Sequence, residues 1–142
     1  MFHVITGGSG SGKSAFAEKC IVQYHHEKSS MEHALYYIAT MEPFGEESRK
    51  KIERHREMRA GKGFRTIECY RELAKQKFPD LGQGTSVLLE CMSNLAANEF
   101  YGRVLDAGKA EEYMVNETVA ELWDGLIRLQ EMCENLVVVT NE

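Results

Sequence analysis

A glycine-rich stretch near the start of the chain contains the residues best suited to bind phosphate. Residues 4–14 read Val-Ile-Thr-Gly-Gly-Ser-Gly-Ser-Gly-Lys-Ser and fit the pattern G-x-x-x-x-G-K-[ST] through Gly7, Gly12, Lys13 and Ser14. Glycines let successive backbone N–H groups point into one concavity, and the N-terminus of a following helix adds positive potential. The stretch therefore predicts a nucleotide-phosphate loop, in preference to a flexible Gly/Ser linker.

The polar residues of this loop have separate expected roles. Lys13 should reach the β- and γ-phosphates, and the Ser14 hydroxyl should hold Mg²⁺. Glu90 ends the apolar run 86–89, and an acidic residue after a buried strand commonly holds the same ion or its waters. We therefore expect a nucleoside triphosphate at the loop, with Mg²⁺ held by the pair Ser14 and Glu90. The predicted nucleotide contacts are Gly7, Gly8, Ser9, Gly10, Ser11, Gly12, Lys13, Ser14, Thr40 and Glu90.

A strongly charged segment, residues 42–59, contains a second group capable of phosphorus chemistry. Its acidic residues come first and its basic residues last, an order that complements a helix dipole and predicts a helix. Ile52, His55 and Arg59 share one face of it. Because few residues of this helix are apolar, we expect it to lie across an opening rather than on a core. Spacing alone favours an exposed, inert His55 over a catalytic one.

The other segments alternate between apolar runs and helical patterns. The adjacent His25 and His26 fall in a polar stretch, which favours a solvated turn over a metal site. This alternation predicts an α/β P-loop (RecA-like) fold, a mostly parallel sheet with helices on both faces. Strands are expected at 2–5, before the phosphate loop, and at 34–40, 64–70, 86–90 and 136–140. Helices are expected at 14–25, 42–59, 71–78, 91–101 and 110–134, and turns or loops at 25–33, 80–84 and 102–108.

Composition limits the possible classes of protein. The chain has 142 residues, 43% of them hydrophobic and 27% charged, which predicts one globular domain. A net charge of −5 gives no overall attraction to nucleic acid, and no apolar run reaches the length of a membrane span. We therefore expect no nucleic-acid or membrane partner and a cytoplasmic location. The four cysteines are widely spaced, which favours reduced, buried thiols.

Several motifs together resemble the bifunctional adenosylcobinamide kinase / adenosylcobinamide-phosphate guanylyltransferase family of cobalamin biosynthesis. The combination of Tyr-Ile-Ala-Thr, Ile-x-x-His-Arg-x-x-Arg and Val-Thr-Asn-Glu is the most specific part of this resemblance. Family members usually have tryptophan where this chain has Phe64, and proline where it has Ala60. They also continue through another helix and strand, which the single domain 1–142 is expected to lack. The matching segments are 5–8, 11–14, 37–40, 49–59, 88–91, 98 and 139–142.

The resemblance implies two successive reactions. The γ-phosphoryl group of ATP or GTP passes to the aminopropanol hydroxyl of adenosylcobinamide, and GMP from GTP is then joined to that phosphate. It also implies that His55 carries the guanylyl group, which reverses the interpretation from spacing. Lys13, His55, Arg56 and Arg59 form the implied catalytic set, with Arg56 or Arg59 neutralising charge at the transferred phosphorus. A homotrimer is implied as well, and the apolar stripe from Val115 to Cys133 is a core or subunit-contact candidate.

Two other functions fit the phosphate loop. The first is a kinase in which His55 is idle, which would retain no label from α-labelled GTP. The second is a RecA-like module in which nucleotide hydrolysis drives binding to protein or nucleic acid. Stimulation of hydrolysis by DNA but not by cobinamide would favour this module, although the net acidity of the chain argues against it.

Overall fold

A sheet of five parallel strands forms the centre of the computed structural model, which describes residues 1–28, 33–79 and 82–141. The strand order is β1-β5-β4-β2-β3. The strands are β1 (Phe2–Gly7), β2 (Leu35–Ala39), β3 (Phe64–Glu68), β4 (Ser86–Glu90) and β5 (Asn135–Asn141). The helices are α1 (Lys13–Lys28), α2 (Gly45–Arg59), α3 (Met92–Ala107), α4 (Tyr113–Met132) and the 3-10 turn η1 (Leu73–Lys75).

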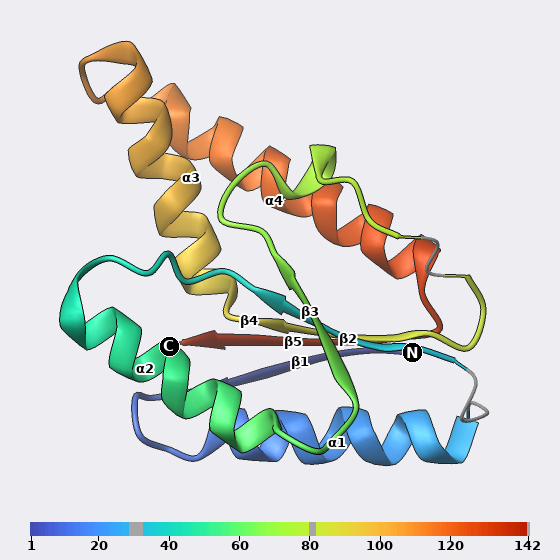
Figure 1. Ribbon diagram of the computed structural model, residues 1–142. Helices are drawn as coiled ribbons and strands as arrows, with labels where there is room; N and C mark the ends of the chain where they lie inside the picture. Colours follow the sequence, from blue (N-terminus) through green and yellow to red (C-terminus); the bar gives the residue numbers. More distant parts are fainter. Residues whose placement is uncertain (29–32, 80–81, 142) are drawn as a thin grey trace.

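Helices cover both faces of this sheet. Figure 1 shows α1 on one face, α3 and α4 on the other, and α2 beside the ends at which the strands finish. The predicted α/β P-loop fold, with a mostly parallel sheet and helices on both faces, is therefore confirmed. No helix in the described part of the chain combines the length and the apolar character that a bilayer span requires.

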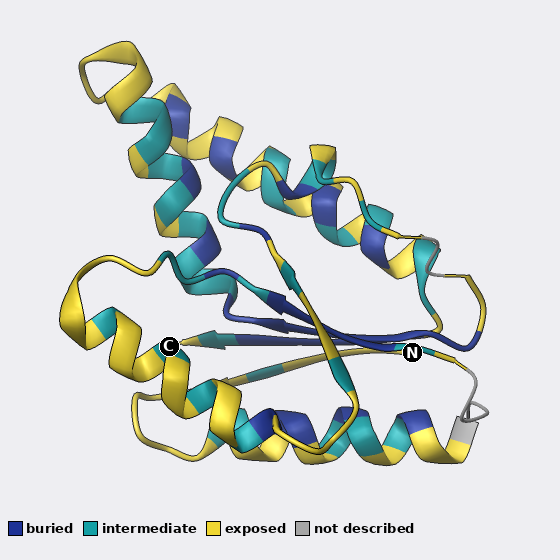
Figure 2. Cartoon of the chain, viewed as in Figure 1, coloured by how far each residue is buried: buried dark blue, intermediate teal, exposed yellow. Residues whose placement is uncertain are grey.

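The central strands supply side chains to two cores. In β4, Leu88 packs with Ala17 and Ile21 of α1, whereas Val87 and Leu89 pack on the α3/α4 face. Every residue of β4 is buried (Figure 2). A parallel strand covered on both faces reads as a continuous apolar run, which is why 86–90 was recognisable in the sequence. This burial fixes the position of Glu90 at the carboxyl end of the strand.

The prediction of a solvated loop at His25 is wrong. Helix α1 continues to Lys28, and His25 is only 7% exposed. Its Nδ1 lies 2.8 Å from Ser86 Oγ, and its Nε2 lies 3.0 Å from the His33 carbonyl oxygen. Asn135 donates a further hydrogen bond to Ser86 Oγ. The polar residues near His25 thus belong to a buried hydrogen-bonded cluster at the amino-terminal end of β4. Residues 29–32 of the predicted loop lie outside the described residues.

This cluster should make the stability of the fold depend on pH. Burial lowers the pKa of His25, and the nearby His26 and His33 lower it further, against an opposing hydrogen bond to the His33 backbone. As the pH falls below about 6.5, His25 therefore takes up a proton in the unfolded chain before it does so in the folded chain. The free energy of unfolding should decrease as the pH falls through this range. Urea unfolding at pH 7.5, 6.5 and 5.5 measures this decrease.

Two variants isolate the contribution of His25. In His25→Gln the neutral amide cannot titrate, so the free energy of unfolding should change less with pH than in the wild type. His26 is exposed, and His26→Gln removes only the smaller effect of His26 on the pKa of His25, so it should change the pH dependence less than His25→Gln does. Equal pH dependence in the wild type and His25→Gln would contradict the assignment.

The predicted helix 71–78 is mostly absent. Ion pairs with acidic residues of α3 hold the start of this segment in another conformation. Arg71 pairs with Glu99 at 3.4 Å and with Asp106 at 3.5 Å, and only η1 remains helical in 71–78. A Cβ atom on Gly102 would overlap the Arg71 guanidinium group. Gly102 therefore marks a close approach within α3 rather than the predicted break, and the helix ends at Gly108, whose φ is 75°.

The apolar stripe of the last helix divides into two parts. Leu129 is buried and Leu122 is partly buried against the core, whereas Val115 and Val119 are 53% and 58% exposed. The exposed residues Trp123 and Ile127 continue the second part at intervals of four along α4.

All four cysteines are free, with Cys69 and Cys91 buried and Cys20 and Cys133 half-buried. Residues 80 and 81 of the predicted turn lie outside the described residues.

Candidate functional site

A cavity of about 620 Å³ opens at the carboxyl ends of the strands. Parallel strands deliver their following loops to one edge, where α/β proteins bind ligands. Its walls come from the phosphate loop, the ends of β2, β4 and β5, one side of α2, and β3. Ten of the predicted site residues line it, namely Ser9, Gly10, Gly12, Lys13, Ser14, Thr40, His55, Arg56, Arg59 and Glu90.

The phosphate loop forms one wall. Gly10 and Gly12 have φ values of 75° and 85°, in the left-handed region that favours glycine. The Lys13 Nζ donates to the Gly8 carbonyl oxygen at 3.1 Å. Gly7, Gly8 and Ser11 belong to the same loop but do not line the cavity, so their predicted nucleotide contacts remain predictions.

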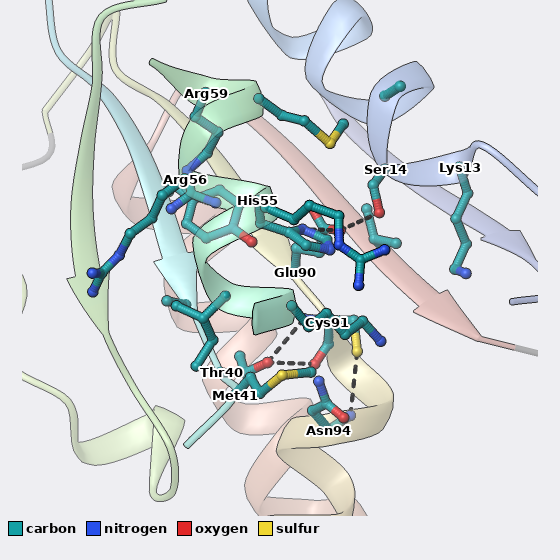
Figure 3. A pocket seen from close by; sticks show the side chains of 18 of the residues that line it. Lys13, Ser14, Thr40, Met41, His55, Arg56, Arg59, Glu90, Cys91 and Asn94 are labelled. Atoms are coloured by element: carbon teal, nitrogen blue, oxygen red, sulfur yellow. Dashed lines mark hydrogen bonds and ion pairs between the residues drawn. The ribbon is translucent and has the colours of Figure 1, made fainter. Parts of the chain in front are cut away.

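One carboxylate joins the phosphate loop to the histidine of α2. Ser14 Oγ donates a hydrogen bond to Glu90 Oε1, and His55 Nδ1 lies 3.3 Å from the same oxygen (Figure 3). Glu90 is 6% exposed, and its Oε2 is buried without a hydrogen-bond partner among the described residues. The structure thus brings together Ser14, His55 and Glu90, which lie far apart in the sequence.

Glu90 is ionised at neutral pH. Burial opposes its ionisation, but hydrogen bonds from His55 and Ser14, and electrostatic attraction to His55 and Arg59, outweigh burial and lower its pKa. A carboxylate that accepts the Nδ1–H of an imidazole fixes the tautomer of the ring and leaves the Nε2 lone pair free. Here this arrangement assigns the proton to Nδ1 of His55.

The Thr40 side chain positions this carboxylate. Its hydroxyl accepts a hydrogen bond from the Cys91 N–H at 2.8 Å and donates one to the Cys91 carbonyl oxygen at 2.9 Å. Asn98 Nδ2 donates to the Thr40 carbonyl oxygen at 2.8 Å. The end of β2 is therefore tied to the residue that follows Glu90. The sequence predicted Thr40 as a nucleotide contact and did not predict these bonds.

Arg59 is held in the cavity wall by an aromatic ring. It is 7% exposed, and its guanidinium carbon lies 3.5 Å from the centroid of the Tyr37 ring. The Arg59 Nη1 is buried without a hydrogen-bond partner among the described residues. Burial raises the pKa of Tyr37, and Glu90 raises it further, so the phenol stays protonated. Sequence reasoning gave Tyr37 no role, because no spacing rule relates β2 to the end of α2.

The predicted magnesium pair fits the oxygen chemistry of that ion. Mg²⁺ prefers hard oxygen ligands and in phosphate-loop proteins takes several of them from water and from the nucleotide phosphates. The Ser14 hydroxyl and the Glu90 carboxylate provide such ligands, and Glu90 Oε2 has no other partner in the described chain. No group of three or more metal-ligating side chains occurs within residues 1–28, 33–79 and 82–141.

Comparison with protein families identifies the chain. Residues 3–142 match the family described as cobinamide kinase / cobinamide phosphate guanyltransferase. The chain belongs to this family. This match confirms the resemblance carried by the motifs and makes the chain a member of a family of kinase and guanylyltransferase enzymes that use nucleotides.

Two curated relatives agree with this assignment. The proteins named bifunctional adenosylcobalamin biosynthesis protein CobU from Escherichia coli (strain K12) and Salmonella typhimurium (strain LT2) are 31% and 29% identical to this chain over 145 residues. Each alignment covers 100% of this chain and 75% of the relative.

Proposed function

We propose that this chain phosphorylates adenosylcobinamide with ATP or GTP and then transfers GMP from GTP to the new phosphate through a guanylylated His55. Membership of the cobinamide kinase / cobinamide phosphate guanyltransferase family supports the two activities. The observation that carries the histidine step is the single Glu90 oxygen contacted by both Ser14 and His55. This contact supports the proposal, because the His55 ring lies beside the loop that would hold the nucleotide.

In the kinase step, the phosphate loop and Lys13 hold the β- and γ-phosphates. Ser14 and Glu90 would hold Mg²⁺, which would supply positive charge against the negative charge that develops on the phosphates. The hydroxyl oxygen of adenosylcobinamide forms a bond to the γ-phosphorus, the bond to the β-phosphate oxygen breaks, and the hydroxyl proton is released. Positioning and electrostatic stabilisation supply most of the catalysis in such transfers.

In the guanylyl step, His55 acts as a nucleophile. Its Nε2 lone pair forms a bond to the α-phosphorus of GTP, and pyrophosphate leaves toward the phosphate loop. The ring keeps its Nδ1 proton and becomes positively charged, which the Glu90 carboxylate stabilises. A phosphate oxygen of adenosylcobinamide phosphate then bonds to the α-phosphorus, the P–N bond breaks, and neutral imidazole returns. Neither transfer requires a proton to leave His55.

Labelled GTP distinguishes the candidate functions. Label at the α-phosphate should remain covalently on the protein, be removed by acid, and pass to adenosylcobinamide phosphate, because a phosphoramidate forms. Label at the γ-phosphate should pass to adenosylcobinamide. Transfer from the γ-position alone would indicate the kinase with an idle His55. Nucleotide hydrolysis stimulated by DNA, with no transfer to cobinamide, would indicate the RecA-like binding module.

Replacing Lys13 with alanine should lower kcat/KM for phosphoryl transfer by about 10²- to 10³-fold, since one charged donor to the transition state is lost. Steady-state assays with γ-labelled ATP and adenosylcobinamide measure this change. Lys19 is exposed on the same helix, outside the residues that line the cavity, and Lys19→Ala is the matched control. Equal activity of the two variants would show that the loop lysine has no role in transfer.

The proposed assembly is a homotrimer in the cytoplasm. Exposed apolar residues along α4 support a subunit contact, because stripes of this kind commonly mark protein interfaces. These exposed residues of α4 are Val115, Val119, Trp123 and Ile127. The substrates are adenosylcobinamide, adenosylcobinamide phosphate, ATP and GTP.

A further inference from the structure

A basic hollow lies beside the main cavity, at the carboxyl end of α2. Arg56 and Arg59 of α2, Phe64 and Thr66 of β3, and the turn between these elements line it. We call it the arginine pocket. Both arginines and Thr66 also line the main cavity, whereas the phosphate loop, His55 and Glu90 do not line the arginine pocket. It is therefore continuous with the main cavity but separate from the part that would hold the nucleotide phosphates.

Among the described residues, no carboxylate lies at ion-pair distance from either arginine. Arg71 and Arg103, in contrast, both pair with Glu99. Arg59 differs from Arg56 in its burial, since only 7% of its surface is exposed. Its Nη1 has no hydrogen-bond partner among the described residues. A buried cation is costly unless an anion or several hydrogen bonds compensate it.

The surrounding contacts hold this cation in place. The Tyr37 ring stacks on the Arg59 guanidinium at 3.5 Å, which fixes its plane. The nearby buried carboxylate of Glu18 pairs with Lys62 at 3.1 Å instead, and this pair joins the turn after α2 to α1. A fixed guanidinium with a free N–H suits a planar pair of phosphate oxygens.

We propose that the arginine pocket binds the phosphate monoester of adenosylcobinamide phosphate, the acceptor of GMP. This inference rests on the proposed function. Guanylyl transfer must bring a dianionic acceptor close to the α-phosphate, so it requires cations other than those of the phosphate loop. Arg56 directly follows His55 on α2, and Arg59 comes one turn later. Figure 3 shows both arginines on the side of His55 and Glu90 opposite to Lys13 and Ser14.

The chemistry of the acceptor agrees with this position. Arginine contacts favour the dianion, whose unprotonated oxygen bonds to the α-phosphorus as the P–N bond to His55 breaks. The Thr66 hydroxyl can donate a further hydrogen bond to the same phosphate. Adenosylcobinamide has no phosphate, so the arginine pocket contributes little to its binding. The pocket therefore retains the product of the first reaction as the substrate of the second.

Calorimetric titration of the whole chain with adenosylcobinamide phosphate and with adenosylcobinamide tests the proposal. Arg56→Gln and Arg59→Gln should each weaken binding of the phosphate ester about 10- to 100-fold, the usual worth of a charged hydrogen bond, and Thr66→Val about 3- to 10-fold. Each of the three variants should weaken binding of adenosylcobinamide less than binding of the phosphate ester, because adenosylcobinamide has no phosphate for the arginine pocket to contact. Arg49 is exposed on α2 and lines neither cavity, so Arg49→Gln is the control.

Equal weakening of both ligands, or unchanged affinity for the phosphate ester, would overturn the proposal. If Arg59→Gln lowers the melting temperature, Arg56→Gln and Thr66→Val still decide, because both residues are exposed. The proposed function is tested separately by retention of α-label on the wild type. Retained label with no loss of phosphate-ester binding in the variants rejects only the pocket. Absence of label with selective loss of phosphate-ester binding rejects only the histidine step.

Discussion

Replacing His55 with alanine should abolish retention of α-label from GTP, with guanylyl transfer reduced by at least about 10⁴-fold, as expected when a covalent nucleophile is removed. The reason is that Nε2 of His55 forms the only bond that holds GMP on the protein in the proposed mechanism. Phosphoryl transfer from γ-labelled ATP to adenosylcobinamide should stay within about threefold of wild type, because that step uses no histidine. Rapid mixing, acid-free denaturation and counting of protein-bound label measure the first effect.

An exposed histidine provides the control. His26→Ala should retain label at the wild-type level, since this side chain lies on the surface of α1 away from the cavity. Label that persists in His55→Ala would place the nucleophile on another residue. A parallel loss of both reactions would instead mean that His55 supports the cavity rather than attacks phosphorus.

The parts of the fold that could be predicted are those encoded locally. The phosphate loop is recognisable because glycine is required at Gly10 and Gly12, whose φ values are positive. The run that ends in Glu90 is recognisable because both faces of β4 are buried, which selects a continuous apolar strand. Parallel pairing then follows from alternation of strands and helices, so the common edge of Lys13 and Glu90 could also be expected.

Features that depend on tertiary contacts could not be predicted. His25 is polar in sequence but buried in the structure, because Ser86 and the His33 carbonyl satisfy both ring nitrogens. Gly102 resembles a helix breaker but lies within α3, where the Arg71 side chain passes too close for a Cβ atom. The stacking of Arg59 on Tyr37 joins α2 to β2 and has no local pattern. Each case depends on a partner that sequence spacing does not identify.

The same limitation applies to the candidate site. Spacing within α2 favoured an inert His55, because no residue of that helix distinguishes a catalytic imidazole from an exposed one. The distinguishing group is Glu90, which lies 35 positions away in the numbering and 3.3 Å from His55 Nδ1 in the structure. Glu90 also accepts a hydrogen bond from Ser14. A carboxylate expected to serve only a metal thus has a second contact that serves the histidine.

Glu90→Gln should therefore impair both reactions, but to different extents. In guanylyl transfer we expect a loss of about 10⁴-fold, comparable to replacing the carboxylate beside the histidine of a catalytic triad by an amide. The neutral amide neither fixes the Nδ1–H tautomer nor stabilises the positively charged ring of guanylylated His55. In phosphoryl transfer we expect a loss of about 10- to 100-fold, because a weaker oxygen ligand remains for Mg²⁺ beside Ser14.

Rapid-quench assays with α- and γ-labelled GTP measure the two losses on the same preparation. Glu68→Gln is the matched control, since Glu68 is an exposed carboxylate that lines the same cavity without a contact to Ser14 or His55. It should leave both rates within about threefold of wild type. A Glu90→Gln enzyme that loses phosphoryl transfer but keeps guanylylation would restrict the carboxylate to the metal. The opposite loss would restrict it to the histidine, so only the combined result supports one carboxylate acting in both reactions.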